Sequence, residues 1–221
     1  MPQVIGLDVG SRSVKVAVFE RGFRGLELSS FSKREFDPGD PEGLSRALDS
    51  VSGEINASGA TVCARIPGDR VLLRFLDLPI ADARKLDQVV PFEVESQVPF
   101  ELDDLIVDHA VVRKNDAGGS RVLVGAARRA DVRGFLPMLS AKGLEPRYLG
   151  AGPSSLASLA TAVPALGQGT VVLVDAGFTR TDVCVLDDGK VVFARTISGG
   201  GADLADAHVS GGGSADEIAA F

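Results

Sequence analysis

The sequence predicts an α/β protein with two lobes and a small α/β unit inserted after the core of the first lobe. Short apolar runs typical of strands alternate with stretches of helical periodicity. A strand–loop–strand pattern near the N-terminus also recurs far along the chain. With 221 residues, of which 45% are hydrophobic and 24% charged, the chain can bury the cores that such lobes need.

Composition excludes several classes of function. A formal net charge of −7 argues against binding to nucleic acid phosphates or to an anionic membrane surface. No apolar run approaches the ~20 residues of a membrane helix, and the first ten residues do not resemble a signal peptide, so we expect a cytosolic chain. Cys63 and Cys184 lie in strand-like runs without a C-x-x-C pair, which favours two reduced core thiols.

The first lobe core is expected over residues 1–79. Its first three strands should form an antiparallel meander, because two are joined by a short polar loop and the third follows Gly22 and Gly25. The breaker at 37–41 precedes a helix that opens at Pro41 and ends at Gly59, with apolar residues at helical spacing. The expected strands of this lobe are 4–9, 13–19, 26–32, 60–67 and 71–76.

The inserted α/β subdomain is expected over residues 80–150. Pro91 should kink its first helix or start a new one. Its expected elements are a helix at 81–97, strands at 105–113 and 120–127 joined by a turn at 115–119, a helix at 129–142 and a strand at 145–150. Residues 151–168 should form a linking helix, centred on 154–162. The start of a second lobe follows at 169–221, with expected strands at 171–176, 182–186 and 190–197.

The strand–loop–strand repeat carries the candidate site. Its two copies, 167 positions apart, match at Asp8 and Asp175, Gly10 and Gly177, Val16 and Val183, and Val18 and Val185. Such loops can present backbone N–H groups and hydroxyls to an anion, while an aspartate holds hydrated Mg²⁺. An Asp-x-Gly turn after a buried strand is also an ordinary turn. The two copies in this order favour two loops that face each other across one nucleotide.

These loops resemble the two phosphate loops of the actin, Hsp70 and sugar-kinase superfamily. The first loop (residues 8–15) carries a lysine seven residues after its aspartate, and the second loop (residues 175–181) carries a threonine six residues after its own. The resemblance implies an actin-like ATPase (ribonuclease H-like) fold, with ATP and Mg²⁺ as candidate cofactors. It assigns phosphate contacts to Asp8, Gly10, Ser11, Ser13, Lys15, Asp175, Gly177, Thr179 and Thr181, and the metal to Asp8 and Asp175.

The insertion indicates a branch of this superfamily. Residues 90–100 resemble the E-x-E-x-x-x-P-F stretch of PilM, and Pro91-Phe92 is similar to the start of the same segment in GspL. The resemblance implies a PilM/GspL-type, FtsA-related actin-like domain of type IV pilus or type II secretion assembly. Such a protein is a scaffold at the cytoplasmic face of the bacterial inner membrane. Its candidate partners are a PilN-like membrane protein or a GspE-like secretion ATPase, and a homodimer is a further candidate assembly.

In PilM-like proteins an extended partner segment binds between the insertion and the first lobe, where an exposed strand edge can supply main-chain hydrogen bonds. A GspL-like docking surface would instead use the face of the lobe. The candidate partner-binding residues are Phe92, Glu93, Glu95 and Phe100. The alternative is that the phenylalanines belong to the core and the glutamates are solvated.

Departures from the superfamily pattern argue against efficient hydrolysis. Arg12 replaces a glycine of actin, and Phe178 and Thr179 leave less space for a phosphate. Residues 150–156 offer only Ser154 and Ser155 where a water-orienting carboxylate or amide is needed. A scaffold that binds ATP without efficient hydrolysis is therefore expected. The alternatives are a nucleotide-hydrolysing or phosphotransfer enzyme and an FtsA-like division protein.

The second lobe looks incomplete, because only about 50 residues remain for it, and a fragment of a longer protein is one interpretation. Gly199-Gly200-Gly201 resembles the glycines that precede a helix in PilM. Gly211-Gly212-Gly213 fits either a flexible linker or a misplaced motif.

Overall fold

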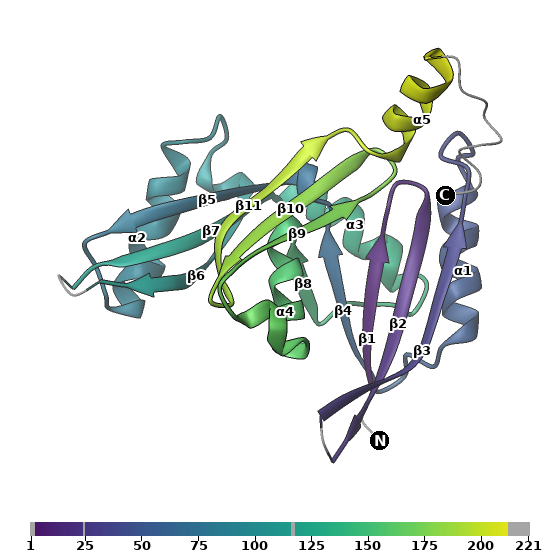
Figure 1. Ribbon diagram of the computed structural model, residues 1–221, viewed down its shortest axis with the longest axis horizontal. Helices are drawn as coiled ribbons and strands as arrows, with labels where there is room; N and C mark the ends of the chain where they lie inside the picture. The colour runs from purple at the N-terminus through teal and green to yellow at the C-terminus, as the bar shows by residue number, and fades with distance from the viewer. Residues whose placement is uncertain (1–2, 24, 116–117, 212–221) are drawn as a thin grey trace.

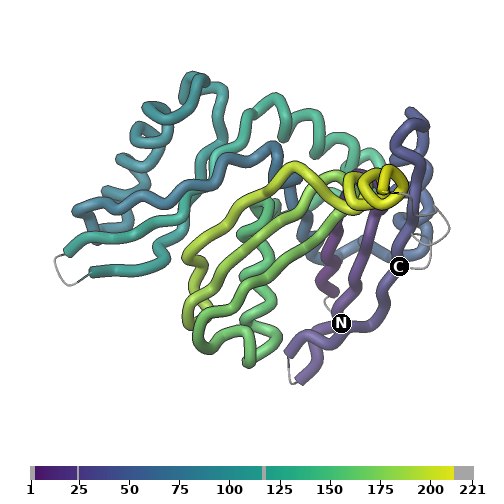
Figure 2. The backbone as a smooth tube through the Cα atoms, turned by 45° about the horizontal axis from the view of Figure 1, so that its top comes forward, coloured from purple at the N-terminus to yellow at the C-terminus, as the bar shows by residue number. Residues whose placement is uncertain are grey.

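The computed structural model describes residues 3–23, 25–115 and 118–211. Within them, strands form three sheets that lie along the length of the molecule (Figure 1). We call them the first sheet (β3-β2-β1-β4-β8), the insertion sheet (β5-β7-β6) and the C-terminal sheet (β11-β10-β9). Figures 1 and 2 both show the C-terminal sheet between the other two, so it is placed to contact each of them.

The first sheet begins with the predicted antiparallel meander, which is confirmed. It consists of β1 (Gln3–Val9), β2 (Ser13–Gly22) and β3 (Gly25–Glu35), and the third strand runs further than expected. On the other side of β1 lie β4 (Thr61–Ile66) and then β8 (Tyr148–Ala151), both parallel to their neighbour. The insertion sheet is built from residues between β4 and β8 in the sequence.

One face of the first sheet is covered by two helices, α1 (Gly43–Glu54) and α3 (Arg129–Ser140). Alternate strand residues such as Val14 and Val16 point to this face and pack against Leu48 and Leu139. Helix α1 starts two residues after Pro41, because tight turns occupy residues 37–43. This shared core holds the meander, and with it the first loop, in place.

The insertion sheet comprises β5 (Val71–Leu78), β7 (Ser120–Arg128) and β6 (Leu105–Lys114). Strand β5 belongs to the stretch that the sequence places in the first lobe core, yet its partner is β7. Helix α2 (Ala83–Glu95) covers one face and continues through Pro91 as one helix, followed by the short η2 (Leu102–Asp104). Residues 116–117 of the predicted turn lie outside the described residues, but Lys114 pairs with Ser120 across it.

The linking segment differs from the predicted helix over 154–162. It forms the 3₁₀ helix η3 (Gly152–Ser158), one turn of α4 (Leu159–Ala162) and the short η4 (Pro164–Gly167). The hydroxyls of Ser154 and Ser155 donate to the carbonyls of Ala151 and Gly152, three residues earlier. These bonds compete with α-helical bonding and accompany the tighter winding.

The C-terminal sheet is a second antiparallel meander of β9 (Thr170–Ala176), β10 (Arg180–Asp187) and β11 (Lys190–Ser198). Asp188 and Gly189 turn between the last two strands with φ of 48° and 73°, the backbone of a tight hairpin. Helix α5 (Gly201–Ser210) then begins at the predicted glycines. Gly212 and Gly213 of the second glycine run lie outside the described residues.

Both cysteines are free thiols, and Cys184 is fully buried in the C-terminal sheet. Burial raises the pKa of its thiol to about 11, so it stays protonated at neutral pH. Cys63 is partly buried, and burial raises the pKa of its thiol as well. None of the helices over the residues that the structure describes is both long and apolar enough to cross a bilayer.

The core predicts a difference between two leucines. Leu48 is 0% exposed under the first sheet, whereas Leu26 on β3 is 55% exposed. Leu48→Ala should lower the free energy of unfolding by roughly 2–5 kcal/mol, because it leaves a cavity. Leu26→Ala should change it by less than about 0.5 kcal/mol. Urea unfolding followed by circular dichroism measures both, and equal losses would show that the helices do not cover this face.

The start of α5 predicts a second pair of variants. A Cβ on Gly200 would lie 2.4 Å from the carbonyl oxygen of Gly177, which is backbone and cannot rotate away. Gly200→Ala should therefore cost about 1–3 kcal/mol. Gly53 in α1 is the control, since a Cβ there has no neighbour within 4 Å, and Gly53→Ala should stabilise by up to about 1 kcal/mol. A harmless Gly200→Ala in the same urea assay would mean that α5 does not pack on the second loop.

Candidate functional site

The first and second loops face each other across one cleft, as predicted. The N–H of Gly10 donates to the carbonyl of Ser13, and the N–H of Gly177 donates to that of Arg180, both at 2.9 Å. The two bonds lie at matching positions of the repeat, so the loops share one turn. A Cβ on either glycine would come within 3.0 Å of the carbonyl that it bonds. The repeat seen in the sequence is therefore a repeat of backbone geometry.

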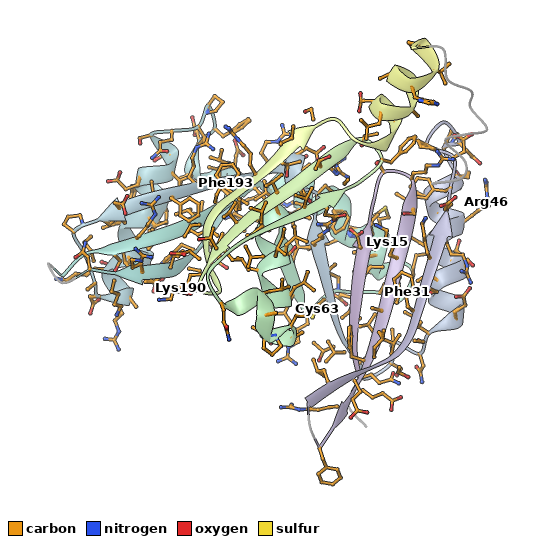
Figure 3. All side chains as sticks on the ribbon, viewed as in Figure 1. Lys15, Phe31, Arg46, Cys63, Lys190 and Phe193 are labelled. Carbon is orange, nitrogen blue, oxygen red and sulfur yellow. The ribbon has the colours of Figure 1, made fainter. Side chains whose placement is uncertain are left out.

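On the first sheet, three charged side chains form a row across neighbouring strands. Lys15, labelled in Figure 3, is paired with Asp8 in the antiparallel register of β1 and β2, and its Nζ lies 3.2 Å from Asp8 Oδ2. Strand β4 runs parallel to β1 with Leu7 beside Ala64, so the next pair in that register is Asp8 and Arg65. The Nε of Arg65 donates to Asp8 Oδ1 at 2.9 Å.

The C-terminal sheet carries the corresponding row. Asp182 on β10 is paired with Asp175 on β9 and with Thr196 on β11. Thr196 Oγ1 donates to Asp182 Oδ1 at 2.6 Å, and Asp182 is only 4% exposed. Asp182 stands seven residues after Asp175, as Lys15 stands seven after Asp8. The second copy of the repeat therefore has a carboxylate where the first copy has an ammonium.

Arg65 joins the two rows. Its Nη2 donates to Asp175 at 2.7 Å and its Nη1 to Asp182 at 3.1 Å, in addition to the bond to Asp8. Burial alone would lower the pKa of Arg65, but the carboxylates of Asp8 and Asp175 raise it above its ordinary value. The five side chains of Lys15, Asp8, Arg65, Asp175 and Asp182 form one ion cluster, which we call the cleft cluster.

The sequence analysis did not single out Arg65 or Asp182. A signal existed for Arg65, because it is the one charged residue in the otherwise uncharged run 60–67 that predicts β4. A charged residue on a central strand needs partners when it is buried. The identity of those partners depends on strand pairing between distant segments.

Besides the cleft cluster, three further contacts involve residues of the two loops. Thr179 Oγ1 donates to Ser11 Oγ at 2.9 Å, which joins the two loops directly. The guanidinium of Arg12 lies 4.8 Å from the centroid of the Phe178 ring. Arg180 forms an ion pair with Asp69. Phe178 was expected to leave less space for a phosphate, and here its ring contacts Arg12.

Another predicted phosphate ligand, Thr181, has a partner within the protein. Thr181 Oγ1 donates to the carbonyl of Gly199 at 2.9 Å and does not line the cleft. The carbonyls of Gly177 and Phe178 accept bonds from the first N–H groups of α5. The cavity that remains between the loops has a volume of about 50 Å³. Such a volume holds a few waters, whereas ligand pockets measure about 300–1,000 Å³.

In this arrangement the residues do not fit a magnesium–nucleotide complex. Arg65 lies between the two carboxylates that would bind the metal, and the N–H groups of Gly10 and Gly177 bond within their own loops. Over residues 3–23, 25–115 and 118–211, no group of three or more His, Cys, Asp or Glu side chains could hold a metal ion. The assignment of nucleotide contacts to the nine loop residues stays a prediction.

The four predicted partner residues occupy different environments. Phe92 is 64% exposed on α2 and is therefore not a core residue, and Glu93 is exposed beside it. Glu95 Oε1 accepts a bond from the N–H of Leu102 at 3.0 Å, which holds the loop after α2. Phe100 lies under the guanidinium of Arg128, 5.5 Å from the ring centroid, and lines a groove of about 720 Å³.

A second groove lies between β8 with η3 and the face of the insertion sheet that α2 does not cover. Its volume is about 380 Å³. We call it the docking groove, and its lining residues are mainly apolar. They include Val71, Leu73, Ile106, Ala110, Leu123, Ala127, Leu149 and Ala151, with Asp108 among them. The sequence carried a signal for this surface, since residues 122–127 of β7 form an uninterrupted run without polar side chains, as in strands covered on both faces.

Several solved protein structures have a fold similar to that of this chain. The solved "PilM-PilN type IV pilus biogenesis complex" is similar with a TM-score of 0.78 and 23% identity, over 97% of this chain and 67% of that chain. The cytoplasmic domain of EpsL, an inner membrane component of the type II secretion system of Vibrio cholerae, matches with a TM-score of 0.57 and 15% identity, over 93% and 74%.

A protein of Bacteroides thetaiotaomicron with an actin-like ATPase fold matches with a TM-score of 0.51 and 11% identity, over 94% of this chain and 75% of that chain. These likenesses confirm the predicted actin-like fold. The family described as type IV pilus assembly protein PilM matches residues 6–219, which is nearly the whole chain. The chain therefore belongs to the PilM family of type IV pilus assembly proteins.

Proposed function

We propose that this chain is a scaffold at the cytoplasmic face of the inner membrane that binds an extended segment of a PilN-like membrane partner in the docking groove. Membership of the PilM family supports this proposal, as does the similar fold of PilM in a complex with PilN. The observation that carries it is the apolar groove between the insertion sheet and β8. This groove lies where the sequence resemblance implies partner binding.

The groove has the shape and chemistry that an extended segment needs. Strands β6 and β8 are the outer strands of their sheets among the described residues, so each has backbone groups that no neighbouring strand bonds. A segment laid beside either strand could bond to these groups, while its alternate side chains enter the apolar floor. Ile106 and Ala110 are exposed on the groove side of β6, and Asp108 between them could pair with a positive charge.

The cleft between the loops supports a scaffold better than an enzyme. The hydroxyls of Ser154 and Ser155 both donate to backbone carbonyls, so neither is oriented by a base toward a reacting atom. The catalytic alternatives require a group that orients water or a substrate hydroxyl. A phosphate-release assay with ATP and Mg²⁺ tests them, and turnover that Asp8→Asn abolishes would favour the enzyme.

The docking groove predicts a loss of partner binding in Ile106→Glu. Ile106 is 39% exposed and lines the groove, and a carboxylate there would have to be desolvated against an apolar segment. We expect at least a tenfold rise in the Kd of a fluorescent peptide from the cytoplasmic N-terminus of the PilN-like partner, measured by anisotropy. The control is Val111→Glu, because Val111 is 41% exposed on the same strand but does not line the groove.

Val111→Glu should leave the Kd within about twofold of that of the wild type. Phe92→Ala and Phe100→Ala belong in the same titration, because these residues are the alternative contacts on the other side of the insertion. A tenfold loss in either phenylalanine variant, with Ile106→Glu unchanged, would move the docking site to that side and contradict the proposal.

A further inference from the structure

The guanidinium of Arg65 lies where the sequence analysis placed a magnesium ion, between Asp8 and Asp175. Each of its three nitrogens donates to a different carboxylate, at 2.9 Å for Asp8, 2.7 Å for Asp175 and 3.1 Å for Asp182. The first carboxylate belongs to β1 and the other two belong to β9 and β10. One side chain of β4 therefore bonds to the first sheet and to the C-terminal sheet at once.

We propose that Arg65 is a built-in cation that replaces a divalent metal ion in the cleft and fastens the C-terminal sheet to the first sheet. The carboxylates that a metal would need already have partners. Both oxygens of Asp8 are bonded, one by Arg65 and one by Lys15. Both oxygens of Asp182 are bonded as well, one by Arg65 and one by Thr196.

A metal ion and Arg65 cannot occupy this place together. Carboxylate oxygens bind Mg²⁺ at about 2.0–2.1 Å, so the ion would have to displace the nitrogens that now face those oxygens. The two cations would also repel each other at this distance. Moving Arg65 away leaves the buried Asp182 without its positive partner, which opposes the exchange.

An arginine suits this position better than a lysine would. The guanidinium is planar and presents donors in a fixed fork, so it can reach three acceptors that lie around one plane. A lysine has all its donors on one nitrogen atom. It therefore cannot place separate donors beside three carboxylates on different strands. The proposal concerns the cleft alone and does not depend on partner binding in the docking groove.

The experiment compares the wild type with Arg65→Gln and uses Mn²⁺ as the probe. Thermal unfolding is measured with and without 1 mM Mn²⁺, which is about the upper end of the range for weak protein sites. Bound Mn²⁺ is counted by electron paramagnetic resonance. Lys33→Gln is the matched control, since it removes one positive charge from an exposed ion pair with Glu35.

We expect the wild type to bind no Mn²⁺ through Asp8 and to keep its Tm when Mn²⁺ is added. Arg65→Gln should lower the Tm by roughly 5–15 °C, because it leaves the buried Asp182 without its positive partner. Mn²⁺ should then bind this variant and restore part of the loss, and the additional change Asp8→Asn should abolish that binding. Lys33→Gln should shift the Tm by no more than about 2 °C.

Three results would overturn the proposal: Asp8-dependent Mn²⁺ binding by the wild type, an unchanged Tm in Arg65→Gln, or an Arg65→Gln variant that gains no Mn²⁺ binding. If Arg65→Gln does not fold, Arg65→Lys keeps a positive charge and serves in its place. Its Tm should fall by several degrees because the fork is lost. A wild-type Tm in Arg65→Lys would contradict the three-carboxylate arrangement.

Discussion

One guanidinium bonds to both the first sheet and the C-terminal sheet. Arg65 emerges from β4 into a cleft that contains three carboxylates from three other strands. Like charges so close repel one another unless a cation lies between them. In this chain the cation is covalently part of the protein and bonds to carboxylates on both sides of the cleft. The direct bond between Ser11 and Thr179 and the contact of Arg12 with Phe178 also join the two sides.

The repeat explains why the charges meet. Two meanders of the same design place an aspartate at the end of their first strand and a second charged residue opposite it on the next strand. If both copies carried a lysine at this second position, the cleft would hold three cations and two carboxylates. Asp182 instead places a negative charge at this position of the C-terminal sheet. It also provides the third acceptor for Arg65. The two halves are therefore alike in backbone and complementary in charge.

Much of this fold could be predicted from the sequence, because the signals are local. Alternation in Val14, Val16 and Val18 predicts a half-buried strand, and the repeated Asp-x-Gly predicts two facing loops. Pairings between distant segments were not predictable in the same way. The partnership of β5 with β7, the docking groove and the partners of Arg65 all depend on which strands become neighbours. The 3₁₀ winding of η3 was missed because serine hydroxyls override the apolar periodicity there.

The central claim is that Arg65 and the carboxylates stabilise the structure only as a set. The most direct test is the effect of Asp182→Asn on the free energy of unfolding in two backgrounds, since asparagine keeps an acceptor for Thr196 but removes the charge. In the wild type this change should destabilise the protein, because Arg65 loses a partner. In Arg65→Gln it should stabilise the protein, because it removes a buried, unpaired carboxylate. The same loss in both backgrounds would contradict the account.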